Sequence, residues 1–427
     1  MNKLLGTLVS ILFFVALNAQ KSTQVVAKKD STNKFTDSIR SLPPLEIKAI
    51  RLSEQAPFAK TNISKAQIAL NNVGQDLPFL LENTPSVVVH ADAGIGVGYT
   101  GIRIRGTDAT RINFTLNGIP YNDAESQGVY WVNLPDLASS VDRVQLQRGV
   151  GSSTYGPGSF GASLNLWTGQ TVQEAGVSMS SAFGSFNTQK HTLKFSTGPL
   201  TDGFSLSGRL SKINSDGYID RASSDLAAYY LEAGYQDQKT KLKVLAFGGQ
   251  EETYQSWYGI PQALLYGPDA NRTFNFYTYE NQVDDYGQDH YQLHYSLQAT
   301  DNWVTKLSAH YTKGSGFFEE YKGKEDLSGY LLDPILDGNV LVDNTDLVRR
   351  RWLDNDYYGL LWANALEVSP TLSLQFGAAL SQYKGDHFGN VIDFPLINVS
   401  PDKAFNYYFS DATKNDVNAY VKANYKL

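Results

Sequence analysis

The 427-residue sequence contains no cysteine, and this absence removes several classes of structure at once. A disulfide framework, a thiolate metal site and a lipid anchor on cysteine all need the missing side chain. Beyond the N-terminus there is also no apolar run of about 18 residues, so no membrane-spanning helix is expected. Charged residues make up 19% of the chain and the net charge is -7, which argues against a nucleic-acid partner.

The sequence is rich in aromatic residues and in short alternating segments. It holds 26 tyrosines and 21 phenylalanines. From residue 176 onward, segments of about ten residues alternate apolar and polar side chains, which is typical of strands. The clearest covers residues 371–382, where leucine and phenylalanine alternate with serine, glutamine and glycine. About ten such strands are expected before the chain stops.

The connections between these strands separate two kinds of all-β protein. Short connections are predicted at residues 198–202, 237–239, 300–302 and 369–370. Long connections are predicted at residues 251–288, 314–355 and 384–415. A soluble sandwich also alternates, but short turns on one side and long loops on the other are typical of an outer-membrane barrel.

The N-terminus reads as an export signal followed by a linker. Lys3 precedes an apolar run over residues 4–17, and Ala19 supplies a small residue for cleavage. Residues 1–19 are therefore predicted to be a signal peptide. Residues 20–44 are polar and are predicted to form a flexible linker on the periplasmic side.

One central stretch, residues 99–161, carries a family resemblance. This stretch and the five residues after it contain IRIRG (102–106), LNGIPYND (116–123), NLPDLASSVDRVQLQRG (133–149) and YGPGSFGASLNL (155–166) in this order. These motifs resemble the plug domain of TonB-dependent outer-membrane receptors, most of all the ferric-citrate and siderophore branch. The resemblance implies an all-β transmembrane barrel of about 22 antiparallel strands, with an N-terminal α+β plug inside its lumen. The plug is expected at residues 60–170. About ten strands enclose too little space for it, so residues 176–427 are expected to form the first part of a larger barrel.

The resemblance also gives a role to the hexapeptide that follows Pro43 and Pro44. Residues 45–50 alternate as an extended segment and look like the family's TonB box. Such a segment can add itself as an edge strand to the sheet of a TonB-like periplasmic partner. The residues predicted to bind this partner are Leu45, Glu46, Ile47, Lys48 and Ala49. Alternation alone equally suits an ordinary first strand of the plug, so both interpretations stay open.

Two sets of residues are predicted to bind the ligand. The plug apex is expected to supply Tyr99, Asn122, Asp123, Glu125, Gln127, Tyr130 and Trp131. The extracellular loops are expected to supply Tyr254, Trp257, Tyr258, Arg349, Arg350 and Arg351. Acidic and aromatic groups at a mouth can accept hydrogen bonds and stack on a rigid ligand. A solvated turn is the alternative for the apex, and binding to lipopolysaccharide phosphates is the alternative for the three arginines.

Contacts between plug and barrel are predicted from charge. The plug arginines Arg103, Arg105 and Arg111 are expected to pair with inward barrel carboxylates such as Glu232, with solvated strand faces as the alternative. Two further patterns are interpreted as structural. Gly96, Gly98 and Gly101 form a dinucleotide-like spacing, but the residues that follow alternate as a strand rather than a helix. The strand histidines do not have metal-ligand spacing, so no metal site is predicted.

Together these features predict a receptor for energy-dependent uptake of a scarce nutrient. The expected cargo is a small metal chelate, a ferric siderophore or ferric citrate, with cobalamin or haem as alternatives in the same family. No enzyme motif is present, and no cofactor is expected, since iron would travel only within the chelate. A passive adhesin or porin is the alternative of another class. The expected location is the outer membrane, among its lipids and lipopolysaccharide.

Overall fold

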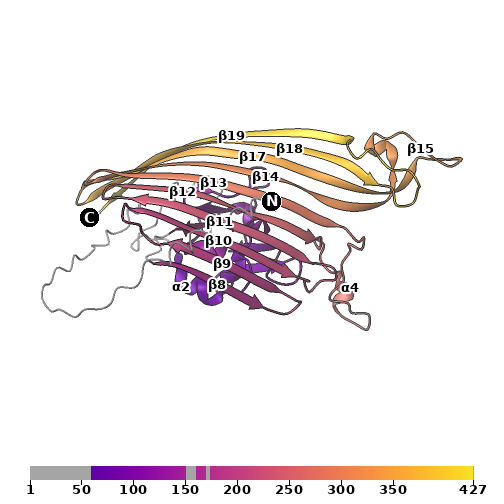
Figure 1. Ribbon diagram of the computed structural model, residues 1–427, viewed down its shortest axis with the longest axis horizontal. Coiled ribbons are helices and arrows are strands. Elements are labelled where there is room, and N and C mark those ends of the chain that lie inside the picture. The colour runs from indigo at the N-terminus through magenta and orange to yellow at the C-terminus, as the bar shows by residue number, and fades with distance from the viewer. Residues whose placement is uncertain (1–58, 151–159, 170–173, 427) are drawn as a thin grey trace, which may run out of the picture. The chain divides into compact units, whose positions relative to one another are not determined.

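The computed structural model describes residues 59–150, 160–169 and 174–426, drawn as coloured ribbon in Figure 1. The predicted signal peptide, the predicted linker and the 45–50 segment lie outside these described residues. Among the described helices, none has the length and apolar character needed to cross a membrane. Two sheets carry most of the described chain.

The first sheet belongs to the predicted plug and has five strands in the order β1-β6-β7-β4-β5. Its strands are β1 (Lys60–Ser64), β4 (Ile112–Leu116), β5 (Ile119–Pro120), β6 (Val141–Arg148) and β7 (Ala162–Thr168). Neighbouring strands are antiparallel except β4 and β7, which run parallel. The sheet is therefore mixed, as an α+β plug requires.

Short helices and a separate strand pair complete the plug. They are α2 (Lys65–Asn71), α3 (Leu77–Leu80), η1 (Ala109–Arg111), η2 (Trp131–Asn133), η3 (Leu137–Ser140), β2 (Val87–Ala91) and β3 (Thr100–Ile104). Ser64 is the N-cap of α2, where Ser64 and Gln67 form a reciprocal capping box. The glycine-rich loop leads directly into the strand β3, so it presents no helix N-terminus to a pyrophosphate.

The plug core is shared between the plug and the sheet that faces it. Apolar side chains of β3, β4, β6 and β7 fill its centre and are almost fully buried, including Ile104, Phe114 and Leu164. Tyr230 and Phe247 of the second sheet belong to the same cluster. Burial of this shared apolar surface favours a plug packed against the wall.

The second sheet has ten antiparallel strands, each paired with its neighbours along the chain (Figure 1). They are β8 (Ala175–Phe183), β9 (Gln189–Thr197), β10 (Phe204–Ser215), β11 (Ser224–Gln236), β12 (Thr240–Tyr254), β13 (Val283–Thr300), β14 (Trp303–Asp326), β17 (Asn344–Ser369), β18 (Leu372–Asp393) and β19 (Asn406–Tyr425). The connections hold α4 (Gln262–Leu265), η5 (Leu327–Tyr330), β15 (Ile335–Asp337) and β16 (Val340–Val342). The predicted ten strands are confirmed.

Burial in the ten-stranded sheet is inverted relative to a soluble protein. On β13 the polar side chains of Gln292 and His294 are 5% and 4% exposed. The apolar side chains between and beside them, Tyr291 and Leu293, are 45% and 44% exposed. The polar face covers the plug while the apolar face points outward, which is the arrangement of a transmembrane barrel wall.

The predicted alternation of short and long connections is confirmed, but the long ones are shorter than expected. In the structure they cover only residues 255–282, 327–343 and 394–405, because the flanking strands continue far into the predicted loops. β14 and β17 stay paired through Phe318 and Arg351, where aromatic and oppositely charged side chains face each other across the strands. The positions of turn-forming residues in the sequence therefore predict the ends of these strands incorrectly.

Candidate functional site

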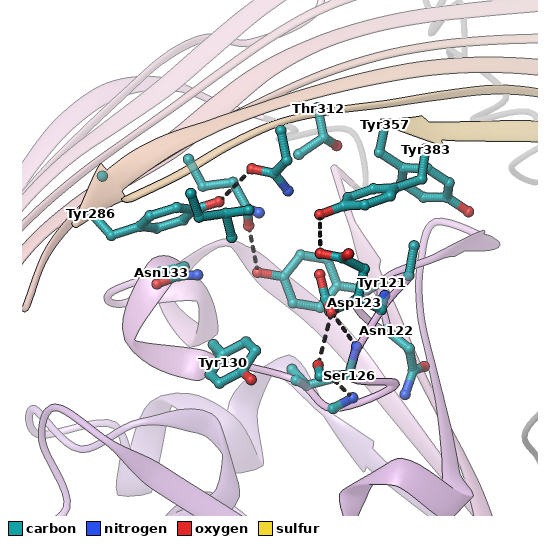
Figure 2. A pocket seen from close by; sticks show the side chains of 18 of the residues that line it. Tyr121, Asn122, Asp123, Ser126, Tyr130, Asn133, Tyr286, Thr312, Tyr357 and Tyr383 are labelled. Atoms are coloured by element: carbon teal, nitrogen blue, oxygen red, sulfur yellow. Dashed lines mark hydrogen bonds between the residues drawn. The ribbon is translucent and has the colours of Figure 1, made fainter. Parts of the chain in front are cut away.

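A cavity of about 620 Å³ lies where the plug apex meets the polar face of the barrel wall. The plug contributes the loop after β5, and the wall contributes side chains from β12, β13, β14, β17 and β18. Figure 2 shows Tyr121 and Asp123 of the plug beneath Tyr286 and Tyr383 of the wall. A molecule in this cavity therefore touches both parts of the protein.

The plug loop at residues 121–130 is held in shape by its own polar side chains. Asn122 accepts a hydrogen bond from the Phe114 amide at 2.8 Å and donates to the carbonyls of Ile112 and Gln127 at 2.9 Å. Asp123 accepts from the Ser126 amide and hydroxyl at 2.7 and 2.8 Å (Figure 2). Asn122 and Asp123 do line the cavity, and the Asn122 amide and the Asp123 Oδ1 are engaged in holding the loop.

The tip of this loop docks on the far strands of the sheet. Tyr383 donates to the Glu125 carboxylate at 2.8 Å, and the His387 Nε2 lies 2.9 Å from the same oxygen. Lys414 donates to the Ala124 carbonyl at 2.8 Å. The predicted apex residue Glu125 is therefore a link between the plug and the barrel wall as well as part of the cavity lining.

Tyr99 joins the plug to the other side of the cavity. Its hydroxyl donates to the Asp284 carboxylate, and its ring lies edge-on to Trp257 at 5.7 Å. Burial, together with the neighbouring carboxylates of Glu251 and Asp284, raises the pKa of Tyr99 well above its usual range. The hydroxyl therefore stays protonated and remains a donor at neutral pH.

Aromatic side chains form much of the remaining lining. Tyr121 donates to Gln288 at 3.4 Å, and its ring lies 5.5 Å from the His290 ring. Tyr286 donates to Asn355 at 2.7 Å. These hydrogen bonds fix the direction of each ring, so the cavity presents a preformed aromatic surface of the kind that holds a small molecule.

Two apex residues predicted to bind ligand lie outside the lining. Trp131 is 2% exposed and packs edge-on against Phe114 at 5.2 Å in the plug core. Gln127 has φ 61° and donates to the Ala124 carbonyl, so it shapes the loop from behind. Tyr130 does line the cavity and is 44% exposed. The structure therefore places Trp131 and Gln127 outside the cavity lining, which the sequence could not show because the type of a side chain does not give its direction.

The loop prediction is corrected in the same way. Trp257 lines the cavity. Tyr258 lies outside the lining: it is 66% exposed, and its ring stacks on the Tyr277 ring with 5.4 Å between the ring centres. Tyr254 ends the strand β12, is buried and donates to the Tyr279 carbonyl. Trp257 is therefore the aromatic residue of this set that faces the cavity.

The basic cluster lies on the strand β17 and not in a loop. Arg349 forms an ion pair with Glu320 at 2.7 Å, and Arg350 pairs with Glu319 at 2.9 Å. Each pair is directly opposite across β14 and β17. Only Arg351 of the three lines the cavity, with its guanidinium 5.6 Å from the Tyr408 ring. Two of the three predicted ligand contacts are therefore neutralised by the neighbouring strand.

The charged contacts between plug and wall are the opposite of those predicted: the plug supplies the anion and the wall supplies the cations. Arg103, Arg105 and Arg111 are exposed. Among the described residues, Glu232 accepts from Tyr230 at 2.6 Å and lies 4.0 Å from Lys243, with no plug arginine in contact. The predicted arginine–Glu232 pairs are therefore wrong.

The charged contact between plug and wall centres on a plug carboxylate. Asp136 lies 2.7 Å from the Lys190 amine and 3.6 Å from the Arg209 guanidinium. It also accepts from Thr192 at 2.8 Å and Ser211 at 2.6 Å. Burial by itself would raise the pKa of Asp136, but the two cations hold it below its usual range. Asp136 lies within residues 133–149, one of the motifs that carry the family resemblance, but the sequence does not indicate which residues of the wall it contacts.

Four further groups of the cavity were missed: Tyr383 and His387 on β18, Glu251 on β12 and Asp284 on β13. A signal for the β18 pair existed, because both continue the polar face that starts at Ser373 with a period of two. The predicted loop boundaries hid this signal. Among the described residues, no group of three potential ligands is placed to hold a metal ion.

Comparisons with known proteins agree on the plug and on the fold. Residues 53–163 match the family described as the TonB-dependent Receptor Plug Domain. A stretch of 114 residues is 28% identical to the vitamin B12 transporter BtuB of Vibrio cholerae serotype O1, covering 27% of this chain and 18% of BtuB.

Two solved structures show the same architecture over most of this chain. The unliganded ferric citrate transporter FecA has a TM-score of 0.67 at 16% identity, covering 87% of this chain and 54% of that one. The P. aeruginosa FpvA complex with a heterologous pyoverdine has a TM-score of 0.65 at 15% identity, covering 87% and 50%. The chain thus spans about half the length of these solved chains.

Proposed function

We propose that the chain is part of a TonB-dependent outer-membrane receptor and that it serves in the energy-dependent uptake of a scarce nutrient. The proposed cargo is a small metal chelate, with a ferric siderophore or ferric citrate ahead of cobalamin or haem. The receptor carries out no chemistry on the cargo, and iron enters only as part of it.

The observation that carries this proposal is the cavity shared by the plug apex and the barrel wall. A ligand held there contacts the loop at residues 121–130 and the wall strands together. Its arrival competes with the bonds that Glu125 makes to Tyr383 and His387, so binding has a direct route to the plug. A passive porin has no need for such a coupling.

In the proposed mechanism, residues 45–50 report ligand binding to the periplasm. A TonB-like partner takes the segment as an added edge strand and pulls on it. The plug, held in the wall by polar contacts such as those of Asp136, is remodelled and opens a path for the ligand. The outward apolar face keeps the barrel among the membrane lipids.

The test is deletion of residues 45–50 from the full-length receptor. We expect uptake of the radiolabelled ligand by whole cells to fall to background, while binding at the cell surface stays unchanged. Uptake that survives the deletion would remove the assigned role of this segment. Uptake that persists after a protonophore collapses the membrane potential would favour a passive porin or adhesin instead.

A further inference from the structure

The charged groups that line the cavity are predominantly acidic. Five carboxylates belong to the lining, on Asp92, Asp123, Glu125, Glu251 and Asp284. Among the residues that the structure describes, Arg351 is the single arginine of this lining. The cationic side chains that would neutralise an anionic chelate are engaged elsewhere, since Arg349 and Arg350 pair with glutamates of β14. The lining that the described residues provide is therefore a poor match for a polyanion.

Glu251 and Asp284 form the most deeply placed acidic pair. Their side chains lie on the same face of two adjacent strands, because Asp284 is paired with Thr253, two residues beyond Glu251. This face is turned to the plug, since Asp284 accepts a hydrogen bond from Tyr99. Diagonal neighbours of this kind on one face of a sheet lie within reach of each other. Glu251 is 0% exposed and Asp284 is 9% exposed.

This acidic pair is incompletely satisfied. Asp284 accepts from the Tyr99 hydroxyl, and Glu251 Oε2 accepts from Thr253 at 3.1 Å. Glu251 Oε1 is buried and has no hydrogen-bond partner in the described part of the chain. No ion pair joins either carboxylate to a cation of the described residues, and buried carboxylates without such a partner are unfavourable.

We infer that the ligand of this cavity carries a cationic group, such as an ammonium, which it directs at Glu251 and Asp284. This inference rests on the proposed function and names the chemical class of its ligand. The ligand supplies the charge and the donors that the chain itself does not place there. Tyr99 and Trp257 line the same end of the cavity, and aromatic rings also attract cations.

The inference separates candidates that the proposed function leaves together. Ferric citrate is polyanionic and brings further negative charge to five carboxylates. A chelate with a neutral metal core and a protonated amine carries a positive charge, which the lining carboxylates attract. We therefore place amine-bearing chelates ahead of ferric citrate as cargo.

The experiment uses full-length receptor in detergent and three defined probes. The first is a ferric trihydroxamate with a pendant ammonium group, the second is its N-acetylated form, and the third is ferric citrate. Quenching of tryptophan fluorescence reports binding, since Trp257 and Trp352 line the cavity. We expect the ammonium form to bind roughly 10- to 100-fold more tightly than the acetylated form, and ferric citrate to bind most weakly.

Two double variants locate the effect. E251Q/D284N removes the acidic pair, and we expect it to make the two trihydroxamates bind alike. E252Q/D285N is the matched control, because it removes the same two charges from the next residue of each strand, on the other face of the sheet. The control should keep the wild-type preference.

Each other result overturns the inference. One such result is that ferric citrate binds more tightly than the ammonium trihydroxamate, and another is that wild type binds the two trihydroxamates equally. The others are that E251Q/D284N still prefers the ammonium form, or that none of the three probes binds. Such results leave the proposed transport function standing, because that function is judged by uptake in cells. Conversely, uptake that resists deletion of residues 45–50 leaves the charge preference of the purified receptor intact.

Discussion

At the scale of single residues, the seat of the plug depends on Asp136. Its backbone has φ 54°, a left-handed conformation that suits aspartate and asparagine better than other residues with a Cβ. This conformation turns the carboxylate out of the plug and toward Lys190 and Arg209, where both partners are buried. The plug brings the anion and the wall brings the cations, so neither is left uncompensated.

We expect Asp136→Asn to destabilise the protein by about 3–5 kcal/mol, because it leaves Lys190 and Arg209 buried without a counter-charge. Asparagine tolerates the same backbone, so the change acts through charge alone. Denaturant unfolding of the full-length protein in detergent measures the loss. Asp225→Asn is the control: it breaks a pair with Lys212 whose side chains are 55% and 45% exposed, and should stay within about 1 kcal/mol. Equal effects of the two changes would contradict this role of Asp136.

At the scale of elements, the short helix α3 is tied to the glycine-rich loop through Asp76. Thr100 donates to the Asp76 carboxylate at 2.9 Å, and the Asp76 amide donates to the Gly96 carbonyl at 2.8 Å. Burial raises the pKa of Asp76 to about 7, with the hydrogen bond from Thr100 opposing and the charge of Asp136 adding to the rise. Asp76 is therefore partly protonated near neutral pH.

This raised pKa predicts how the plug responds to pH. In the unfolded chain Asp76 ionises near its ordinary value of 3.8, whereas in the fold it holds its proton up to about 7. The folded state binds more protons between these values, so its contribution to stability is full below pH 4 and declines as the pH rises to 7. The hydrogen-exchange protection factors of the α3 amides, which are corrected for the intrinsic rise of exchange with pH, should fall across this range in wild type. Asp76→Asn should flatten the profile, and an unchanged profile would rule Asp76 out.

At the scale of the whole molecule, the plug and wall touch through backbone as well as side chains. Gly249 of β12 faces the plug helix η2 so closely that an added Cβ would lie 2.4 Å from the Asn133 carbonyl and 2.5 Å from Pro135. Backbone cannot yield as a flexible side chain can. The seal between plug and wall therefore depends on a glycine in the middle of a strand.

We expect Gly249→Ala to push the plug from the wall, lowering stability by about 1–3 kcal/mol and making cells more sensitive to large hydrophilic antibiotics. Gly176→Ala on β8 is the matched control, because its added Cβ would meet nothing within 4 Å. Antibiotic sensitivity and the melting temperature of the purified protein are the measurements. If Gly249→Ala matches the control in antibiotic resistance and in melting temperature, the plug does not pack against β12 at Gly249.

Much of this molecule follows from local patterns in the sequence. Alternation with a period of two fixed the ten strands and the polar lumen face, as Gln292 and His294 illustrate. The capping box of Ser64 and Gln67, three residues apart, marks the start of α2. These features depend on neighbours a few residues apart, so the sequence by itself determined them.

Only the tertiary structure decided which side chains meet. Glu125 and Tyr383 are 258 positions apart, and nothing local to either one names the other. Strand register set Arg349 and Arg350 against two glutamates and so removed them from the cavity. The same register left Glu251 without a cation. A period of two says which face a residue occupies, whereas its partner depends on the pairing of distant strands and on the seating of the plug.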